Sequence, residues 1–219
     1  MRFQSFMDCP TELAASNLDL LAPFRNKLDD LLLTEIDGDD PTRRLRAIVA
    51  SLTLESELFG AEQIAEDLSS VDDKVEFRFL VSKLKQGSPS LKNQLWDTFQ
   101  RVDLRNLSEE ETADVVRLSI GLLAFGDTRA IEKLFLNIEN PTLTTIVTHQ
   151  IREYLADANL ILECLNAVTG RPSVQFHLMI AASNCKLSSF NSKRQSECCL
   201  LYTSPSPRDL STSRMPSSA

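Results

Sequence analysis

The sequence is poor in the residues on which many catalytic motifs depend. It contains only six glycines and two histidines among 219 residues. Neither G-x-G-x-x-G nor G-x-x-x-x-G-K is present, so the sequence contains neither of these two types of phosphate-binding loop. The motifs H-R-D, D-F-G, G-x-S-x-G and H-E-x-x-H are absent as well. We therefore expect no enzyme in this segment, with no catalytic, cofactor-binding or metal-binding residues and no cofactor.

Long apolar runs and basic clusters are also missing. The longest apolar stretch, Leu118–Phe125, is far shorter than the roughly 20 residues that a membrane-spanning helix needs. The formal net charge is −8, and no cluster of Lys and Arg offers a binding surface for phosphates. The first residues, Met1–Phe6, lack the apolar core of a signal peptide. We expect a cytoplasmic protein whose partners include neither nucleic acid nor membrane.

The five cysteines form no metal-binding pattern. Cys9, Cys164 and Cys185 are widely scattered, and no C-x-x-C pair or zinc-type spacing occurs. Cys164 lies in an apolar helical pattern, which predicts a place in the core. The cysteines are therefore expected to be incidental thiols in a reducing compartment.

Apolar residues recur with the period of an α-helix from about residue 10 to 183, and no sustained alternation predicts strands. Four stripes show the spacing most clearly: Leu45, Ile48, Val49 and Leu52; Phe77, Leu80, Val81 and Leu84; Leu91, Leu95, Trp96 and Phe99; and Ile131, Leu134, Phe135 and Ile138.

Capping residues agree with these stripes. A residue with a capping side chain precedes a proline in Asp40-Pro41, Ser88-Pro89 and Asn140-Pro141, as expected for a helix start. Ser108 and Glu111 have the spacing of a capping box. Gly126 and Gly170 are placed as helix ends, followed by Asp127 as a cap and by Pro172 as a first residue.

The predicted helix starts are evenly spaced. They lie near Pro41, Asp72, Glu109, Pro141 and Pro172, about 31 to 37 residues apart, and a second helix is expected between them, at about 61–68, 89–101, 128–138 and 158–168. Two helices per unit with such a period are typical of an α-solenoid. We predict an all-α fold, a truncated HEAT-like α-solenoid of antiparallel helix pairs over residues 10–183. A compact irregular helical bundle is the competing fold.

Several segments resemble one family in the expected order. Asn140–His149 resembles a HEAT-like unit of the form D-P-x-x-R-x-x-x-x-H. Val116–Gly126 resembles an A-x-A-L-L-x-L-G helix, and Ser173–Ala181 an S-[VI]-R-x-A-L-x-L-A helix. The segment Asp39–Ala47 and the pair Leu95-Trp96 also resemble segments of this family and occur in the expected order. The family consists of large bacterial proteins that join a Ser/Thr kinase-like domain or HEAT-like repeats to a C-terminal formylglycine-generating (sulfatase-modifying-factor) domain.

The resemblance covers roughly residues 15–183 and implies no catalytic residue there. Thr144 and Gln175 stand where the family tends to have Arg, and residues 180–184 lack its usual Leu-Gly-Glu ending. The family's arginines would link consecutive units, so their loss is expected to loosen the stack without abolishing the fold.

Three segments lie outside the predicted repeats. No structure is assigned to residues 1–9. Residues 184–198 are rich in Ser, Lys and Asn and are interpreted as a linker or as misread sequence. Residues 199–219 resemble the in-frame translation of a transposon-type sequencing adapter, so we interpret them as a non-native, disordered tail of a fragment.

Each residue that suggests chemistry also has a simpler interpretation. His149 and His177 occupy equivalent rows of adjacent units, but two histidines without a third ligand make a weak metal site, and both are expected to be packed or capping residues. Residues Asp37 to Asp40 lack the later ligands of a calcium loop and predict a turn with an N-cap. Trp96 and Phe99 are expected in the core, with an aromatic anchor on a concave face as the alternative.

The carboxylates of Glu109, Glu110 and Glu111 suit the N-terminus of their own helix. Taken together, the pattern predicts a non-catalytic protein–protein interaction or scaffolding module that binds a protein partner or a neighbouring domain of the same chain. The family resemblance implies an alternative, a regulatory spacer of a multidomain formylglycine-generating-type enzyme or Ser/Thr kinase. A stand-alone helical adaptor is a third possibility.

Overall fold

The computed structural model describes residues 2–54, 63–88, 90–137, 139–155, 157–192 and 194–195. Within these ranges the chain is helical and contains no strand, so the predicted all-α class is confirmed. The α-helices are α1 (Arg2–Asp8), α2 (Thr11–Asp19), α3 (Asp29–Ile36), α4 (Pro41–Thr53), α5 (Ile64–Ser70), α6 (Lys74–Gly87), α7 (Leu91–Gln100), α8 (Glu109–Ala124), α9 (Arg129–Phe135), α10 (Pro141–Tyr154), α11 (Ala158–Ala167) and α12 (Pro172–Ser183). Two short 3₁₀ helices, η1 (Ala22–Lys27) and η2 (Leu187–Ser189), complete the set.

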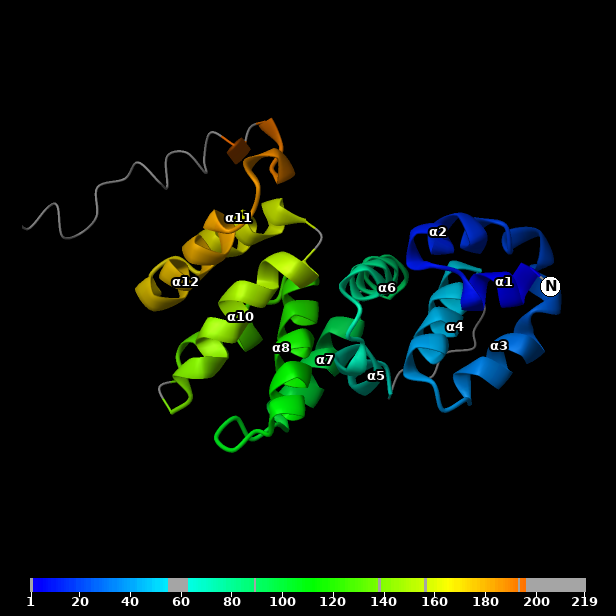
Figure 1. Ribbon diagram of the computed structural model, residues 1–219, viewed down its shortest axis with the longest axis horizontal. Helices are drawn as coiled ribbons and strands as arrows, with labels where there is room; N and C mark the ends of the chain where they lie inside the picture. Colours follow the sequence, from blue (N-terminus) through cyan, green and yellow to red (C-terminus); the bar gives the residue numbers. More distant parts are fainter. Residues whose placement is uncertain are drawn as a thin grey trace, which may run out of the picture.

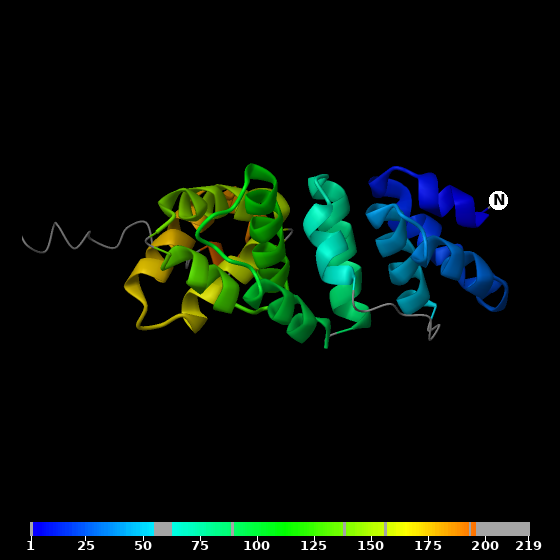
Figure 2. The ribbon, with the colours of Figure 1, turned by 90° about the horizontal axis from the view of Figure 1, so that it is seen from below.

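The helices follow one another along the long axis of the molecule. Helices α1 to α4 lie at one end, α6 lies in the middle, and α10 to α12 lie at the other end (Figure 1). The view from below shows the same succession (Figure 2). Helix α4 packs on α6, α6 on α8 and α10, α8 on α10, and α10 on α12. The shorter helices pack beside this row, α5 against α4, α7 and α8, and α9 against α8, α10 and α12.

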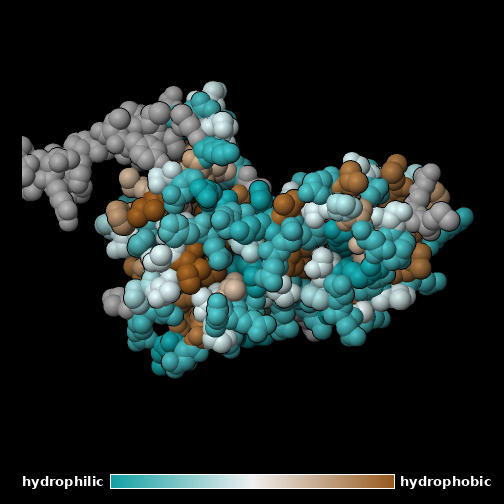
Figure 3. Space-filling model, in the orientation of Figure 1, coloured by the Kyte–Doolittle hydropathy of each residue, from teal (hydrophilic) through white to brown (hydrophobic). Residues whose placement is uncertain are grey.

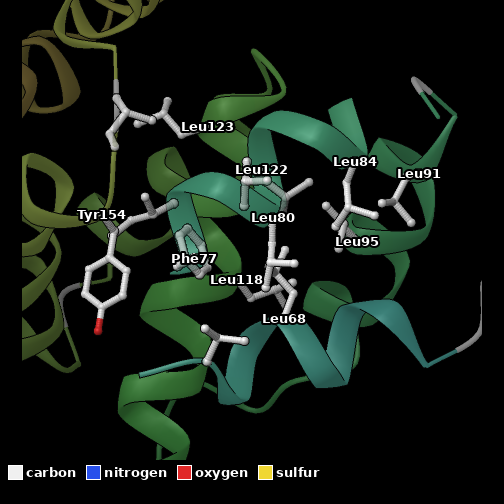
Figure 4. Packing of buried hydrophobic residues seen from close by; sticks show 14 of the residues in the cluster. Leu68, Phe77, Leu80, Leu84, Leu91, Leu95, Leu118, Leu122, Leu123 and Tyr154 are labelled. Carbon is white, nitrogen blue, oxygen red and sulfur yellow. The ribbon is translucent and has the colours of Figure 1, made fainter. Parts of the chain in front are cut away.

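The predicted apolar stripes form the core between the helices. The side chains of Phe77, Leu80 and Leu84 on α6 are fully buried and lie near Leu68 and Leu122 (Figure 4). Burying an apolar side chain of this size contributes about 1.5 to 3 kcal/mol. The other stripes are buried too, except that Leu52 and Trp96 are half-buried. Ile138 lies outside the described residues.

Most predicted helix starts are confirmed. Asp40 Oδ1 accepts hydrogen bonds from the backbone N–H groups of Thr42 and Arg43, and α4 begins at Pro41. Ser108 and Glu111 form the predicted capping box. Gly126 and Gly170 have φ values of +79° and +87°, in the left-handed region where glycine is favoured. Asp127 accepts from the backbone N–H of Arg129, although Thr128 holds the capping position of α9.

Two predicted caps are wrong. Asn140 precedes α10 but makes no side-chain capping bond, because its ψ of 79° departs from the extended geometry of a capping residue. Helix α7 begins at Leu91, with Ser88 and Ser90 hydroxyls 3.3 Å apart and no side-chain cap. Pro89 lies outside the described residues. Helix α6 begins at Lys74 because Asp73 accepts from two backbone N–H groups.

The segments beside the predicted repeats are partly structured. Residues 2–8 form α1, which packs on α2 and α4. Phe190 is 4% exposed, so the chain after α12 returns to the core. Residues 199–219, interpreted above as adapter-derived, lie outside the described residues. None of the described helices is both long and apolar enough to cross a membrane.

Candidate interaction groove

The two histidines have different surroundings. His149 is exposed and lies within α10 rather than at its end, which corrects the prediction that it is a packed or capping residue; the packed side of α10 carries Leu143, Val147 and Ile151 instead. The ring of His177 lies 4.9 Å from that of Phe135 and 5.5 Å from that of Phe176. Burial lowers the pKa of His177, which favours the neutral imidazole. Within the described residues, no group of three His, Cys, Asp or Glu side chains is placed to hold a metal ion.

The aromatic pair lies at the edge of the core. Phe99 is fully buried, as predicted, and Trp96 stacks on it with a centroid distance of 5.7 Å. The guanidinium of Arg129 lies 4.2 Å from the centroid of the Trp96 ring, a cation–π contact. Trp96 therefore contacts both Phe99 and Arg129 of the same chain.

The cysteines and acidic segments largely match their simpler interpretations. Cys164 is buried, and burial raises the pKa of its thiol to about 11. Cys9 Sγ lies 3.2 Å from the carbonyl oxygen of Phe6. The segment Asp37–Asp40 forms the expected turn and cap before α4. Among the described cysteines, Cys9, Cys164 and Cys185, no disulfide is formed.

A buried arginine that sequence reasoning missed joins three helices. Arg46 on α4 donates to both carboxylate oxygens of Glu76 on α6, at 2.8 and 2.6 Å. Its Nη1 also donates to the backbone carbonyls of Phe6, Met7 and Cys9, at 2.9 to 3.0 Å. These carbonyls end α1, where a helix leaves acceptors unsatisfied. The sequence feature that could have identified Arg46 is a charged residue within the apolar face of a predicted helix.

A second buried arginine has a similar role. Arg117 on α8 donates to the backbone carbonyl of Ser69, at the end of α5, and to the carboxylates of Asp72 and Asp114. In both cases a guanidinium satisfies carbonyls at the end of a neighbouring helix. The arrangement holds helices together and presents no group to a substrate.

A third pair is less well satisfied. Arg44 Nε on α4 lies 3.3 Å from Asp67 Oδ2 on α5, and within the described part of the chain neither atom has a hydrogen-bond partner. Arg44 Nη1 donates to Gln63. Burial raises the pKa of Asp67 to about 6, although Arg44 partly opposes this effect. A buried carboxylate beside one poorly aligned cation costs stability.

One hollow with described walls lies between α6 and α11. We call it the α6–α11 groove; its volume is about 500 Å³. One wall is a single face of α6, on which residues three or four apart point the same way. This wall carries Arg78, Val81, Ser82, Lys85 and Gln86. Figure 3 shows the upper outline of the molecule indented between α6 and the α10–α11 region.

The other wall comes from the ends of α8 and α10 and from the start of α11. Asp157 caps α11 by accepting from the N–H of Asn159, which fixes the direction in which Leu160 and Glu163 project. Tyr154 is held at the base of the groove, because its hydroxyl donates to the Asp72 carbonyl and its ring packs edge-on against Phe77. The remaining lining residues are Ala124 and Leu155.

The groove is apolar at its base and charged at its rims. Val81, Leu155 and the ring of Tyr154 form the base, whereas Arg78 and Lys85 lie on one wall and Asp157 and Glu163 on the other. Lys85 also donates to the Ala124 carbonyl, where α8 ends. Such a surface binds by burying apolar atoms and matching charges of both signs. Ser82 and Lys85 both line the groove, but Lys85 is bonded to the Ala124 carbonyl, and the described residues contain no group of three potential metal ligands.

Two other hollows are smaller. One, of about 390 Å³, lies beside the loop before α8 and is lined by Arg101 and by several carboxylates, including Asp103 and Asp114. The other, of about 330 Å³, lies between α8 and α10 and includes Leu107 and Ile146. Neither of these two hollows is lined by a histidine or a cysteine.

No protein-family model, curated protein or solved structure matches the chain.

Proposed function

We propose that this chain is a non-catalytic protein–protein interaction or scaffolding module that holds a partner segment in the α6–α11 groove. The observation that carries the proposal is the groove itself. Its walls come from α6 and α11, which are separated in sequence, and its base is apolar. A segment of a partner protein, or of a neighbouring domain of the same chain, would bury that base.

We further propose that the helices form a HEAT-like α-solenoid. In support, the longer helices α4, α6, α8, α10 and α12 each contact the next, and the shorter helices between them lie alongside. In such a stack each unit contacts mainly its neighbours, which leaves a long surface for a partner. On this proposal the chain is a cytoplasmic adaptor that acts by binding, and the stack supplies its surface.

The rims of the groove define the kind of segment that fits. An apolar side chain over Tyr154 and Leu155 would be flanked by an acidic residue facing Arg78 and Lys85. A basic residue would face Asp157 or Glu163. A segment with both charges around an apolar centre is favoured over one with a single sign, because either sign alone leaves one rim unmatched.

A random-peptide display selection on the full chain tests this function. We expect enriched peptides to bind the wild-type chain and to lose binding to Ser82→Trp, which fills the groove from an exposed position on α6. The matched control is Ser173→Trp, at an exposed serine on α12 outside the groove. Enriched peptides that bind both variants equally would refute a role for the groove.

The alternative, a regulatory spacer of a formylglycine-generating-type enzyme or a Ser/Thr kinase, concerns catalytic domains that the family resemblance implies. It stays a prediction of the family resemblance. The groove would then receive a segment of the neighbouring domain, and the same Ser82→Trp variant would release that domain.

A further inference from the structure

The chain after α12 turns back toward α10 and α11. We call this part the return segment (residues 184–192 and 194–195); Figure 1 shows it in orange, next to α11. At its start, Arg152 Nη1 on α10 donates to the backbone carbonyl of Asn184 at 3.0 Å. Further along, Phe190 is part of the buried core. The return segment is therefore attached to the fold by a hydrogen bond and by an apolar anchor.

The return segment brings a cation to the rim of the α6–α11 groove. Arg194 Nη2 lies 3.3 Å from Oε1 of Glu163, which lines the groove from α11. One turn earlier on the same helix, Asn159 Oδ1 accepts from the backbone N–H of Asn191 at 3.1 Å. Asn191 Oδ1 in turn accepts from the backbone N–H of Arg194 at 2.9 Å. These two hydrogen bonds hold the return segment along α11 and place Arg194 beside Glu163.

The contact between Arg194 and Glu163 is one that a competing cation can break. The side chain of Arg194 is 21% exposed, whereas that of Glu163 is 57% exposed. An ion pair with so exposed a carboxylate changes an equilibrium constant by no more than about fivefold. The buried pair of Arg46 and Glu76, in contrast, is held by two shorter hydrogen bonds.

Arg194 also changes the balance of charge around the groove. The lining residues include two basic side chains, Arg78 and Lys85, and two acidic ones, Asp157 and Glu163. With Arg194 beside Glu163, basic side chains outnumber acidic ones by three to two. A basic residue of a bound segment then reaches Glu163 only by displacing Arg194.

We propose that the return segment regulates the α6–α11 groove by holding Arg194 on Glu163 as a tethered competitor for the basic residue of a bound segment. This inference rests on the function proposed above. Because the competitor belongs to the same chain, its effective concentration at Glu163 does not fall on dilution. With the return segment in place the groove favours acidic segments, and with Arg194 released it accepts segments that carry both charges.

Parallel selections from one random-peptide library, on the wild-type chain and on Arg194→Gln, test the proposal. We expect Lys and Arg to be more frequent among the peptides that Arg194→Gln enriches. Fluorescence anisotropy then measures the affinity of a fluorescein-labelled form of one such peptide. Arg194→Gln should bind it about two- to fivefold more tightly than the wild type, the range for one exposed ion pair. Phe190→Ser, which removes the apolar anchor, should also raise the affinity.

Three controls separate competition at Glu163 from a general effect of charge. Arg171→Gln removes an arginine that pairs with Glu132 and does not line the groove, so it should leave the affinity unchanged. In a Glu163→Gln background, Arg194→Gln should have no effect, because the pair is already broken. The same peptide with Gln in place of its basic residues should bind the wild type and Arg194→Gln equally. Circular dichroism verifies that each variant remains folded.

The possible outcomes distinguish this regulation from the function of the groove. Equal affinities of the wild type and Arg194→Gln would overturn the proposal and leave the groove function intact. The same holds for an equal gain in Arg171→Gln or in the Glu163→Gln background. Peptides that bind Ser82→Trp as well as the wild type, or selections that enrich none, would refute the groove function and the regulation with it.

Discussion

The buried carboxylate of Asp67 makes the stability of this protein depend on pH. Its pKa is raised from 3.8 to about 6, mainly by burial, while Arg44 lies 3.3 Å away without an aligned hydrogen bond. The folded state therefore holds this proton more tightly than the unfolded chain. The contribution of this carboxyl group to the free energy of unfolding is fully present below about pH 4. It decreases as the pH rises from about 4 to about 6, and it is absent above that range.

Replacing Asp67 with asparagine removes the ionisation and keeps the shape. Raising a pKa from 3.8 to about 6 corresponds to about 3 kcal/mol between the two protonation states. Asparagine also loses the attraction to Arg44, so we expect Asp67→Asn to gain about 1 to 3 kcal/mol at pH 8. Near pH 4 the wild-type carboxyl is neutral, and the gain should vanish.

Urea unfolding between pH 4 and pH 8 measures the difference, with the fluorescence of Trp96 and the helical circular dichroism as parallel probes. The matched control is Asp39→Asn, at an exposed carboxylate in the turn before α4, which should leave the curve unchanged. An Asp67→Asn variant that is less stable than wild type at pH 8, or equally shifted at every pH, would refute the reasoning.

Three further predictions concern stability and reactivity. Glu76→Ala should lower the free energy of unfolding by about 3 to 5 kcal/mol, because it strands the buried Arg46 guanidinium; a loss below about 1 kcal/mol in urea titrations would instead indicate an ordinary exposed ion pair. Gly126→Ala should lower the free energy of unfolding by about 1 to 2 kcal/mol in the same assay, because φ is +79°. The space around Gly126 is open, so no steric contact adds to this cost. Gly126→Asn should recover part of the loss. Cys164, with a pKa of about 11, should react with a thiol reagent at pH 8 about 100-fold more slowly than an unperturbed cysteine; equal rates before and after adding urea would contradict its burial.

Local signals in the sequence were sufficient to place many helices. Pro41, Glu109, Pro141 and Pro172 are first residues of helices as predicted, because a proline or a capping box acts within one turn. Even the missing cap at Asn140 left the start of α10 correct, since the proline alone is compatible with a helix start. The apolar stripes are buried as predicted, because apolar residues that recur with the helical period lie on one face of a helix and that face packs against the core.

Long-range contacts were not predictable in this way. Arg46 finds acceptors 30 to 40 residues away, and only the packing of α1, α4 and α6 brings them together. The α6–α11 groove likewise depends on how far apart two helices are held, which no local pattern specifies. His149 shows the same limit, because a helical position alone did not tell which side of α10 a neighbour covers.

The contact between Arg46 and the end of α1 also has a consequence for synthesis on the ribosome. The carbonyls of Phe6, Met7 and Cys9 precede Arg46 by 37 to 40 residues. At about 5 to 20 residues per second, Arg46 is synthesised about 2 to 8 seconds after these three carbonyl groups. Glu76, which neutralises that cation, follows 30 residues later. The apolar side chains of the N-terminal helices, which are buried in the folded chain, therefore lack the contacts with α4 and α6 until those helices have been synthesised.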